Sequence, residues 1–392
     1  MGKFFSSVSN SNMSLKPSHI FNTNFLLLKI FGIWSGIVPI KNYVIYSFTF
    51  LLINLIIYDL LLTLNLAYTP RKVEFLIREV IFYFTEITVA AKVLMVLRMR
   101  KQFLEVFYIF DSEDFAGDDE FSRKIVSRSL SFYKTYYRTI SIVSNFAYSS
   151  QVFFPIISSF IFNSAFELPI CKYYFLSGEI INKYFTFLYI YQSFGMYSHM
   201  QYNVNIDSLV AGTMLLVLTQ LKVLNYEIRS LKVSKQELET GQDKSRLKRI
   251  LEHYSLFLEC SKTVQHILSL TMFVQVLMSA AIICVVLCGL TLFSNTYFSL
   301  PVYLYNTTFS YFLPYLFQSQ ALVFAAYNCD WIPRSESFKR SIILLSQRAN
   351  CAIELTGLKM FQLSLNTFTS IMKTAYSLFT LIRNVQARQI EG

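Results

Sequence analysis

The polar side chains of one long apolar segment, 358–386, are the residues of this chain best placed to do chemistry. The segment contains neither Gly nor Pro, so nothing interrupts a helix that is long enough to cross a bilayer. Polar side chains recur through its interior: Ser364, Asn366, Thr367, Thr369, Ser370, Lys373, Thr374, Ser377, Thr380 and Asn384. Lipid offers no hydrogen-bond partners to such groups. The segment must therefore turn one face to protein or water, either as a buried helix of a membrane bundle or as the lining of a pore.

Signals for enzyme chemistry are weak in the rest of the chain. It has four His residues, and it shows no Gly-rich phosphate loop, metal-ligand spacing or nucleophile elbow. Asp59, Glu79 and Glu86 lie inside apolar stretches, which is compatible with proton handling or with paired and pocket-lining groups inside a bundle. The six Cys residues include no CxxC pair and are expected to be small buried thiols. We predict a protein that is not an enzyme and that has no cofactor, no catalytic residues and no metal site.

The composition is that of a polytopic membrane protein. Of the 392 residues, 54% are hydrophobic and 17% are aromatic, and the mean hydropathy is +0.43. The net charge of +11 comes from bases in short segments between apolar stretches, so membrane topology explains it better than nucleic-acid binding does. We predict an all-α fold with seven transmembrane helices at 43–68, 75–97, 140–162, within 184–227, 272–292, 302–327 and 358–386.

The fourth stretch, 184–227, decides the topology. It is apolar at both ends and polar in the middle, so it forms either two short spans or one very long helix. With one span and a cytoplasmic N-terminus, the basic segments 98–138, 229–249 and 334–348 all lie inside, as the positive-inside rule requires. We therefore predict one long helix.

That helix is too long for the membrane alone. Some 44 residues reach roughly 65 Å, against about 30 Å of hydrocarbon. Its continuation carries an apolar stripe at helical spacing, and 251–293 has the same oversized design. We expect both helices, and an amphipathic helix at 331–352, to form a cytoplasmic anchor body. Segment 102–138 is expected to be a solvated loop with short helices, and 24–40 an interfacial helix with Trp34 at the headgroup level.

Three stretches resemble insect odorant receptors. The end of the chain, Tyr376-Ser377-Leu378-Phe379-Thr380-Leu381-Ile382-Arg383-Asn384, is similar to their Tyr-Ser-x-Phe-Thr signature, although Ala375 stands where a Thr is usual. Ala325-Ala326-Tyr327-Asn328-Cys329-Asp330-Trp331 and Ser364-Leu365-Asn366-Thr367-Phe368 also look like that family. The resemblance implies a heterotetrameric, non-selective cation channel that volatile odorants open directly. A tuning subunit binds the odorant, and a co-receptor subunit completes the assembly.

The resemblance also implies residue roles. The final helix of each subunit lines the pore, and aligning the tail places Leu381, Asn384 and Val385 at its constriction. Spans two, three, four and six supply an aromatic cavity for the odorant. The candidates, chosen by their expected depth in the membrane, are Phe82, Tyr83, Glu86, Ser149, Phe153, Phe154, Tyr189, Phe194, Tyr197, Thr308, Tyr311 and Phe312. Lys373 is expected to face a vestibule or to pair with an acid such as Asp59, Glu86 or Asp207.

Other chemoreceptors fit the sequence less well. The co-receptor of the family carries a long insertion before span five, whereas this chain has only about 229–249 there, so it resembles a tuning subunit. Gustatory receptors, the alternative with the same fold, usually end in a Thr-Tyr pattern that is missing here. A G-protein-coupled receptor would place its N-terminus outside, against the basic loops, and neither Asp-Arg-Tyr nor Asn-Pro-x-x-Tyr occurs at the expected places.

These expectations give one organisation for the whole chain. It comprises an N-terminal arm with the interfacial helix (1–41), spans one to four as the ligand-binding half (42–206), the cytoplasmic anchor (207–267), spans five and six (268–328), a cytoplasmic helix (329–357), the pore-lining span (358–386) and a short extracellular tail (387–392). The expected partners are a small volatile odorant, the co-receptor and the lipid bilayer, with no nucleic acid. The expected location is the plasma membrane of olfactory sensory neuron dendrites.

Overall fold

A computed structural model of the protein describes residues 16–34, 41–112, 115, 119–163, 166–231, 242–292 and 321–350, together with positions 356, 357, 361, 362, 370, 373, 374, 377 and 380. The described elements are η1 (Pro17–Phe21), α1 (Asn22–Ile30), α2 (Lys41–Leu51), the π-helical turn η2 (Leu52–Ile57), α3 (Tyr58–Tyr68), α4 (Val73–Arg98), α5 (Arg100–Phe110), α7 (Glu120–Phe162), α8 (Gly178–Lys183), α9 (Phe185–Arg229), α11 (Gln242–Leu292), α13 (Ala321–Asn328), α14 (Glu336–Asn350), and the antiparallel pair β1 (Thr356–Gly357) and β2 (Phe361–Gln362). The predicted all-α fold is confirmed, with one two-residue ladder added to it.

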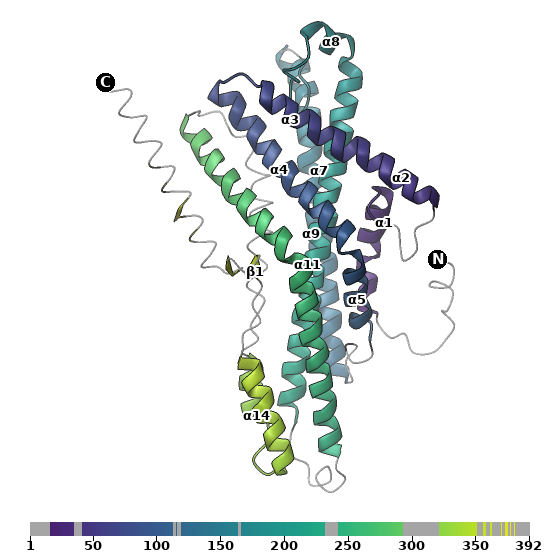
Figure 1. The fold of residues 1–392 in the computed structure, drawn as a ribbon, viewed down its shortest axis with the longest axis vertical. Coiled ribbons are helices and arrows are strands. Elements are labelled where there is room, and N and C mark those ends of the chain that lie inside the picture. The colour runs from purple at the N-terminus through teal and green to yellow at the C-terminus, as the bar shows by residue number, and fades with distance from the viewer. Residues whose placement is uncertain are drawn as a thin grey trace.

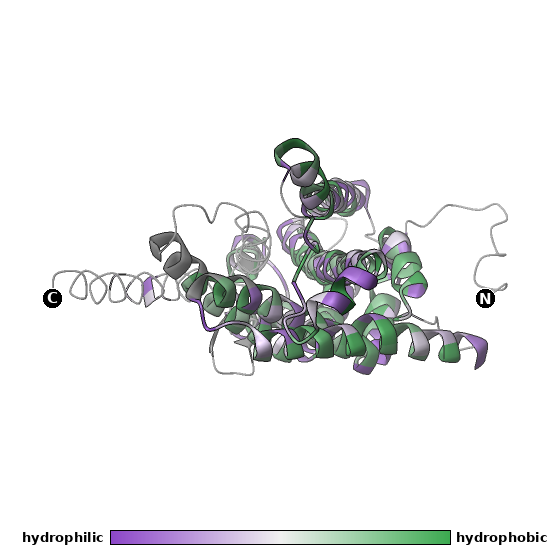
Figure 2. Ribbon diagram, turned by 90° about the horizontal axis from the view of Figure 1, so that it is seen from above, coloured by the Kyte–Doolittle hydropathy of each residue, from purple (hydrophilic) through white to green (hydrophobic). Residues whose placement is uncertain are grey.

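Within the part of the chain that the structure describes, five helices are long and apolar enough to cross a membrane: Lys41–Tyr68, Phe75–Arg98, Glu120–Phe162, Phe185–Arg229 and Lys244–Val285. They coincide with the first four predicted spans and include most of the fifth, 272–292. The predicted spans 302–327 and 358–386 lie mostly outside the described residues, so the total of seven stays a prediction. Seen from above, hydrophobic residues predominate on these helices (Figure 2). Many of them face outward, as lipid-facing side chains do: Val44, Ile45, Phe48, Ile142, Phe146, Ile157 and Phe160.

Helix α9 is the central element. It is one continuous helix of 45 residues, as the positive-inside argument predicts, and it packs against α4, α7, α11 and α13. Figure 1 shows α7, α9 and α11 running along the long axis of the molecule. From Ser198 to Leu224 nearly every side chain of α9 is buried. A helix that is buried on all sides must supply partners for its own polar residues, and this requirement shapes the site described below.

The lower part of the bundle is the body that the overlong helices were predicted to form. Leu224 and Ile228 of α9 belong to one buried core with Phe257 and Val264 of α11. The predicted amphipathic helix at 331–352 is found as α14, which buries Phe338, Ile342, Leu345 and Ala349 and exposes its charges. The connection between α9 and α11 spans residues 230–241.

The prediction of a solvated loop with short helices at 102–138 holds for α5 but is wrong for 120–138, which begins a long helix. Residues 100–110 form α5, and α7 begins at Glu120 and continues without a break for 43 residues. Asp119 caps α7 by accepting a hydrogen bond from the backbone N–H of Ser122 at 2.8 Å. The charged residues of this region occupy one helix face while Val126, Leu130 and Tyr133 are buried on the other. The high density of charged residues indicated a loop, whereas their spacing is that of an amphipathic helix.

The interfacial position of Trp34 is also not what the structure shows. Its side chain is buried, stacks on Phe25 at a ring separation of 4.7 Å, and lies 5.6 Å from the guanidinium of Arg100. Gly32 has a φ of +80°, which allows the chain to turn back sharply after α1. The turn directs Trp34 into the core, where it packs on protein instead of standing exposed at the surface.

Candidate functional site

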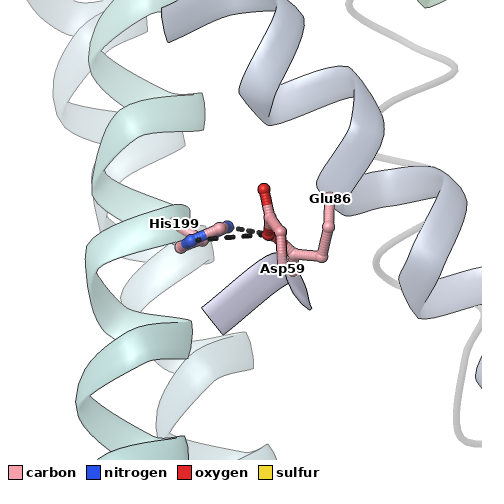
Figure 3. A group of neighbouring side chains, drawn as sticks. All are labelled: Asp59, Glu86 and His199. Carbon is pink, nitrogen blue, oxygen red and sulfur yellow. Dashed lines mark hydrogen bonds and ion pairs between the residues drawn. The ribbon is translucent and has the colours of Figure 1, made fainter. Parts of the chain in front are cut away.

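Three ionisable side chains converge between α3, α4 and α9 (Figure 3): Asp59, Glu86 and His199. The Nδ1 atom of His199 contacts Oε2 of Glu86, and its Nε2 lies 4.0 Å from Oδ1 of Asp59. His199 Nε2 is also 2.7 Å from the backbone oxygen of Asn54. A carbonyl oxygen only accepts, so Nε2 carries the proton of that hydrogen bond. The imidazole is buried, whereas 25% of the Asp59 side chain is exposed.

The local fold explains how these groups meet. The π-helical turn Leu52–Ile57 directly precedes α3, whose second residue is Asp59, and such turns are frequent at functional sites. It brings the carbonyl of Asn54 to His199, while the Tyr58 ring packs on the imidazole at 4.7 Å between ring centroids. We call Asp59, Glu86 and His199 the three-helix cluster.

A second polar contact lies further along α4 and α9. Lys92 Nζ is 2.7 Å from Oδ1 of Asp207 and 2.6 Å from Oδ1 of Asn203, and both members of the ion pair are buried. The acids considered as partners for Lys373 thus have other partners, because Asp207 pairs with Lys92 and Glu86 contacts His199. Lys373 itself is exposed.

The predicted odorant-contacting residues occupy different environments. Phe82 and Tyr189 pack around a small buried cluster formed by Tyr58, Leu62 and residues 168–173. Tyr197 is partly buried and packs on Tyr148 at 5.1 Å between ring centroids. Tyr83 and Ser149 are half-buried, Glu86 belongs to the three-helix cluster, and Phe153, Phe154 and Phe194 are exposed on the outside of the chain. Thr308, Tyr311 and Phe312 lie outside the described residues, as do Leu381, Asn384 and Val385, which were predicted to line the pore.

The segment between α7 and α9 covers the aromatic residues at the α8 end of the bundle. Phe166 packs on Phe185 at 4.8 Å and on Tyr189 at 5.3 Å between ring centroids. Gln192 of α9 holds the segment, because its side chain accepts from the N–H of Ile170 at 3.2 Å and donates to the carbonyl oxygen of Cys171 at 2.9 Å. Partly buried aromatic rings beneath a hydrogen-bonded cover are typical of the surroundings of a small apolar ligand.

The sequence shows Asp59 and Glu86 as carboxylates inside spans and His199 as part of the polar middle of 184–227, but nothing in it groups the three. Asp59 and Glu86 were recognised as carboxylates within spans, and the interpretation as paired groups in a bundle holds for Glu86. The signal that could have found the cluster is the polar middle of 184–227, because His199 needs a partner from a neighbouring span. No spacing along the chain reveals which span supplies it.

Comparison with known proteins identifies the family. The family model of the 7tm odorant receptor matches residues 72–376. Odorant receptor 19a of Drosophila melanogaster is 25% identical over 201 residues, which cover 48% of this chain and 51% of that protein. Odorant receptor 59a of the same species is 28% identical over 146 residues, or 35% of this chain and 36% of that protein. The matched part of the chain spans about half the length of the first of these curated relatives.

The fold is also shared with solved structures. The insect olfactory receptor OR5 from Machilis hrabei, in complex with eugenol, superposes with a TM-score of 0.81. The sequence identity is 14%, and the match covers 95% of this chain and 100% of that chain. A second structure of OR5 gives a TM-score of 0.78 at 13% identity. At this identity the likeness establishes the fold. The proteins of this family and fold are receptors and not enzymes, and on the match over 72–376 the chain belongs to the insect odorant receptor family.

Proposed function

We propose that this chain is the odorant-binding tuning subunit of a ligand-gated cation channel that a co-receptor subunit completes. The observation that carries the proposal is the family match over 72–376, which includes most of the bundle. The likeness to an olfactory receptor solved with eugenol supports a small odorant as the ligand class. The proposed location is the plasma membrane of olfactory sensory neuron dendrites, in keeping with five helices able to span a membrane.

The short connection between α9 and α11 supports the tuning role. It comprises only residues 230–241, whereas the co-receptor of the family is expected to carry a long insertion there. A tuning subunit supplies ligand specificity, and its partner supplies the rest of the pore.

The odorant site is proposed at the α8 end of the bundle. Phe82 and Tyr189 are partly buried there beneath the segment 166–177, and Tyr197 is partly buried further along α9, where it packs on Tyr148 and Phe31. Aromatic side chains with few polar groups favour a small apolar molecule, which is held by apolar contacts and oriented by one or two hydrogen bonds.

Opening of the channel then follows from a difference in odorant affinity between two arrangements of the helices. An odorant that binds one arrangement of the helices more tightly shifts the population toward it. In the proposed mechanism the final helix moves with that arrangement, so that Leu381 and Val385 no longer exclude water while Asn384 faces the permeating ion.

The deciding experiment records currents from cells that express this chain together with the co-receptor, using an odorant panel and excised patches without nucleotide. We expect at least one odorant to evoke cation current within milliseconds, and cells with the co-receptor alone not to respond to it. A response that requires GTP and G protein would contradict the proposal. So would surface expression of both subunits with no response across the panel and no change from the co-receptor alone.

The position of the odorant site has its own test. Tyr197→Leu is expected to shift the odorant concentration for half-maximal current at least tenfold, because it removes a ring that faces Tyr148 inside the bundle. Phe160→Leu is the matched control, since that ring is 90% exposed. Equal effects of the two variants would place the site elsewhere.

A further inference from the structure

We propose that Asp59, Glu86 and His199 form a binding site for Zn²⁺ or a chemically similar divalent transition metal ion. One donor atom from each residue lies within 4.8 Å of the other two. The three residues come from α3, α4 and α9, so a bound ion would join three helices of the bundle (Figure 3). The proposal concerns ion binding and does not depend on the odorant.

The tautomer of His199 supports a cation between the imidazole and Glu86. Because Nε2–H donates to the carbonyl oxygen of Asn54, a neutral imidazole presents the lone pair of Nδ1 to Oε2 of Glu86. Two acceptor atoms that face each other need a proton or a metal ion between them. A ring nitrogen that ligates a metal while the other ring N–H donates to a backbone carbonyl is the usual arrangement of metal-binding histidines.

A divalent metal ion would balance the charge of the cluster if both carboxylates are ionised. Two ionised carboxylates in an apolar bundle carry two negative charges, and burying uncompensated charge is costly. In the part of the chain that the structure describes, the ion-pair contacts of Asp59 and Glu86 are both with His199. A proton on His199 neutralises one carboxylate only. A divalent cation neutralises both.

Two buried polar atoms beside the cluster point to a ligand. The hydroxyl of Tyr58 has no hydrogen-bond partner among the described residues, although the side chain is 1% exposed and its ring packs on His199. Oδ1 of Asp59 is likewise buried without a hydrogen-bond partner there. Buried polar groups are normally satisfied, so these two atoms need an explanation. An ion bound by Asp59 would satisfy Oδ1 of its carboxylate. A water molecule at the open coordination position of the ion would be the partner for the Tyr58 hydroxyl.

The donor set selects the class of ion. One imidazole nitrogen and two carboxylate oxygens suit Zn²⁺ and its neighbours in the first transition row, whereas Ca²⁺ and Mg²⁺ prefer oxygen ligands alone. A tetrahedral zinc ion with bonds of about 2.0–2.1 Å holds its ligand atoms roughly 3.3 Å apart. Oε2 of Glu86 lies closer to Nδ1 than this and Oδ1 of Asp59 lies on the Nε2 side, so ion binding would require both carboxylates to turn toward a common point.

The test uses the purified full-length receptor with its co-receptor, in lipid nanodiscs and free of chelator. Co²⁺ serves as the spectroscopic probe, because tetrahedral Co²⁺ with a nitrogen ligand absorbs visible light, and Zn²⁺ is then titrated in to displace it. We expect visible bands that Zn²⁺ abolishes and that a large excess of Mg²⁺ leaves unchanged. Asp59→Asn and His199→Gln should each weaken Zn²⁺ binding at least tenfold, since even outer-shell changes commonly cost 10–100-fold.

The controls separate this site from other donors. Glu79→Gln changes another buried carboxylate of α4, which accepts from Asn65 at 2.8 Å, and should leave Zn²⁺ affinity unchanged. His253→Gln removes a second buried imidazole beside a carboxylate, that of Glu227, and should also have no effect on the Co²⁺ bands. If His199→Gln fails to fold, Asp59→Asn decides, because it keeps the contact between His199 and Glu86. Unchanged Zn²⁺ affinity in Asp59→Asn, or absence of Co²⁺ bands in the unmodified receptor, would mean that a proton alone joins the cluster and would overturn the proposal.

Discussion

Gly195 of α9 lies directly against the ring of Tyr58 of α3. A methyl group on Gly195 would be 2.2 Å from Cε2 and 2.4 Å from Cδ2 of that ring, closer than any real contact allows. The close approach holds Tyr58, and with it Asp59, against α9 one helical turn before His199. The absence of a side chain at one position of α9 therefore helps to assemble the three-helix cluster.

Gly195→Ala tests this contact. We expect the substitution to destabilise the receptor by about 1–3 kcal/mol, because neither the buried ring nor the helix backbone has room to move. The measurement is the melting temperature of the purified receptor, followed by fluorescence-detected size exclusion. Gly178→Ala is the matched control, since an added Cβ there meets nothing within 4 Å.

The double variant with Tyr58→Leu makes the test specific. Removing the ring should relieve most of the clash, so Gly195→Ala should cost less in the Tyr58→Leu background than in the unmodified receptor. Equal costs in the two backgrounds would show that Gly195 matters for another reason.

The buried pair Lys92–Asp207 gives a second prediction. Lys92→Met leaves the Asp207 carboxylate buried without its cation, and loss of one partner of such a pair costs about 3–5 kcal/mol. Lys92→Met combined with Asp207→Leu should recover most of that loss, because an apolar pair needs no compensation. The same melting assay measures each variant, and additive losses would argue against a coupled pair. Lys172→Met in the exposed pair with Glu167 is the control, with an expected change below about 1 kcal/mol.

The sequence alone predicts the fold well wherever hydropathy and charge act over long segments. The single long helix at 184–227 follows from the distribution of Lys and Arg, and the structure confirms it as α9. The prediction of a solvated loop with short helices at 102–138 is wrong for 120–138, because the charged residues there recur at helical spacing on one face of α7. The buried face of α7 at Val126, Leu130 and Tyr133 is the signal that was overlooked.

The site is less predictable than the fold, for a physical reason. His199 needs a partner within a low-dielectric bundle, but which carboxylate it meets depends on the relative rotation and offset of three helices. Packing details such as the Gly195–Tyr58 contact set that geometry, and such contacts produce no periodic pattern in a single sequence. The individual residues were therefore recognisable, whereas their convergence was not.

Asp119 provides a prediction about pH. Burial acts to raise the pKa of its carboxyl, but the hydrogen bond from the backbone N–H of Ser122 and the interaction with Tyr226 outweigh this and hold the pKa below its ordinary value of 3.8. A group with a lowered pKa stabilises the fold above its unfolded-state pKa, and the stabilisation disappears as the pH falls through the folded-state pKa. Asp119→Ala should therefore cost about 1 kcal/mol at neutral pH, and the difference from the unmodified receptor should shrink below about pH 4.

Hydrogen exchange checks this prediction at the helix start. Amides of the first turn of α7, including that of Ser122, should exchange faster in Asp119→Ala than in the unmodified receptor at neutral pH, while those near Tyr133 should not change. Asp119→Asn keeps a capping oxygen and should lie between the two. Identical exchange in all three proteins would show that the cap contributes nothing measurable.

The proposed pore gives the last prediction. If Leu381 and Val385 close the channel by excluding water, shortening either side chain widens an apolar constriction and favours its wetting. Leu381→Ala and Val385→Ala should each increase current in the absence of odorant or change the relative permeability to Na⁺ and K⁺. Asn384→Leu should instead reduce single-channel conductance, because it removes the amide proposed to face the ion.

Leu344→Ala serves as the control, since that side chain is exposed on α14. The recordings use this chain with the co-receptor at matched surface expression. Unchanged leak, permeability and conductance in all three pore variants would remove these residues from the ion path, while leaving the proposed odorant site open to its own test.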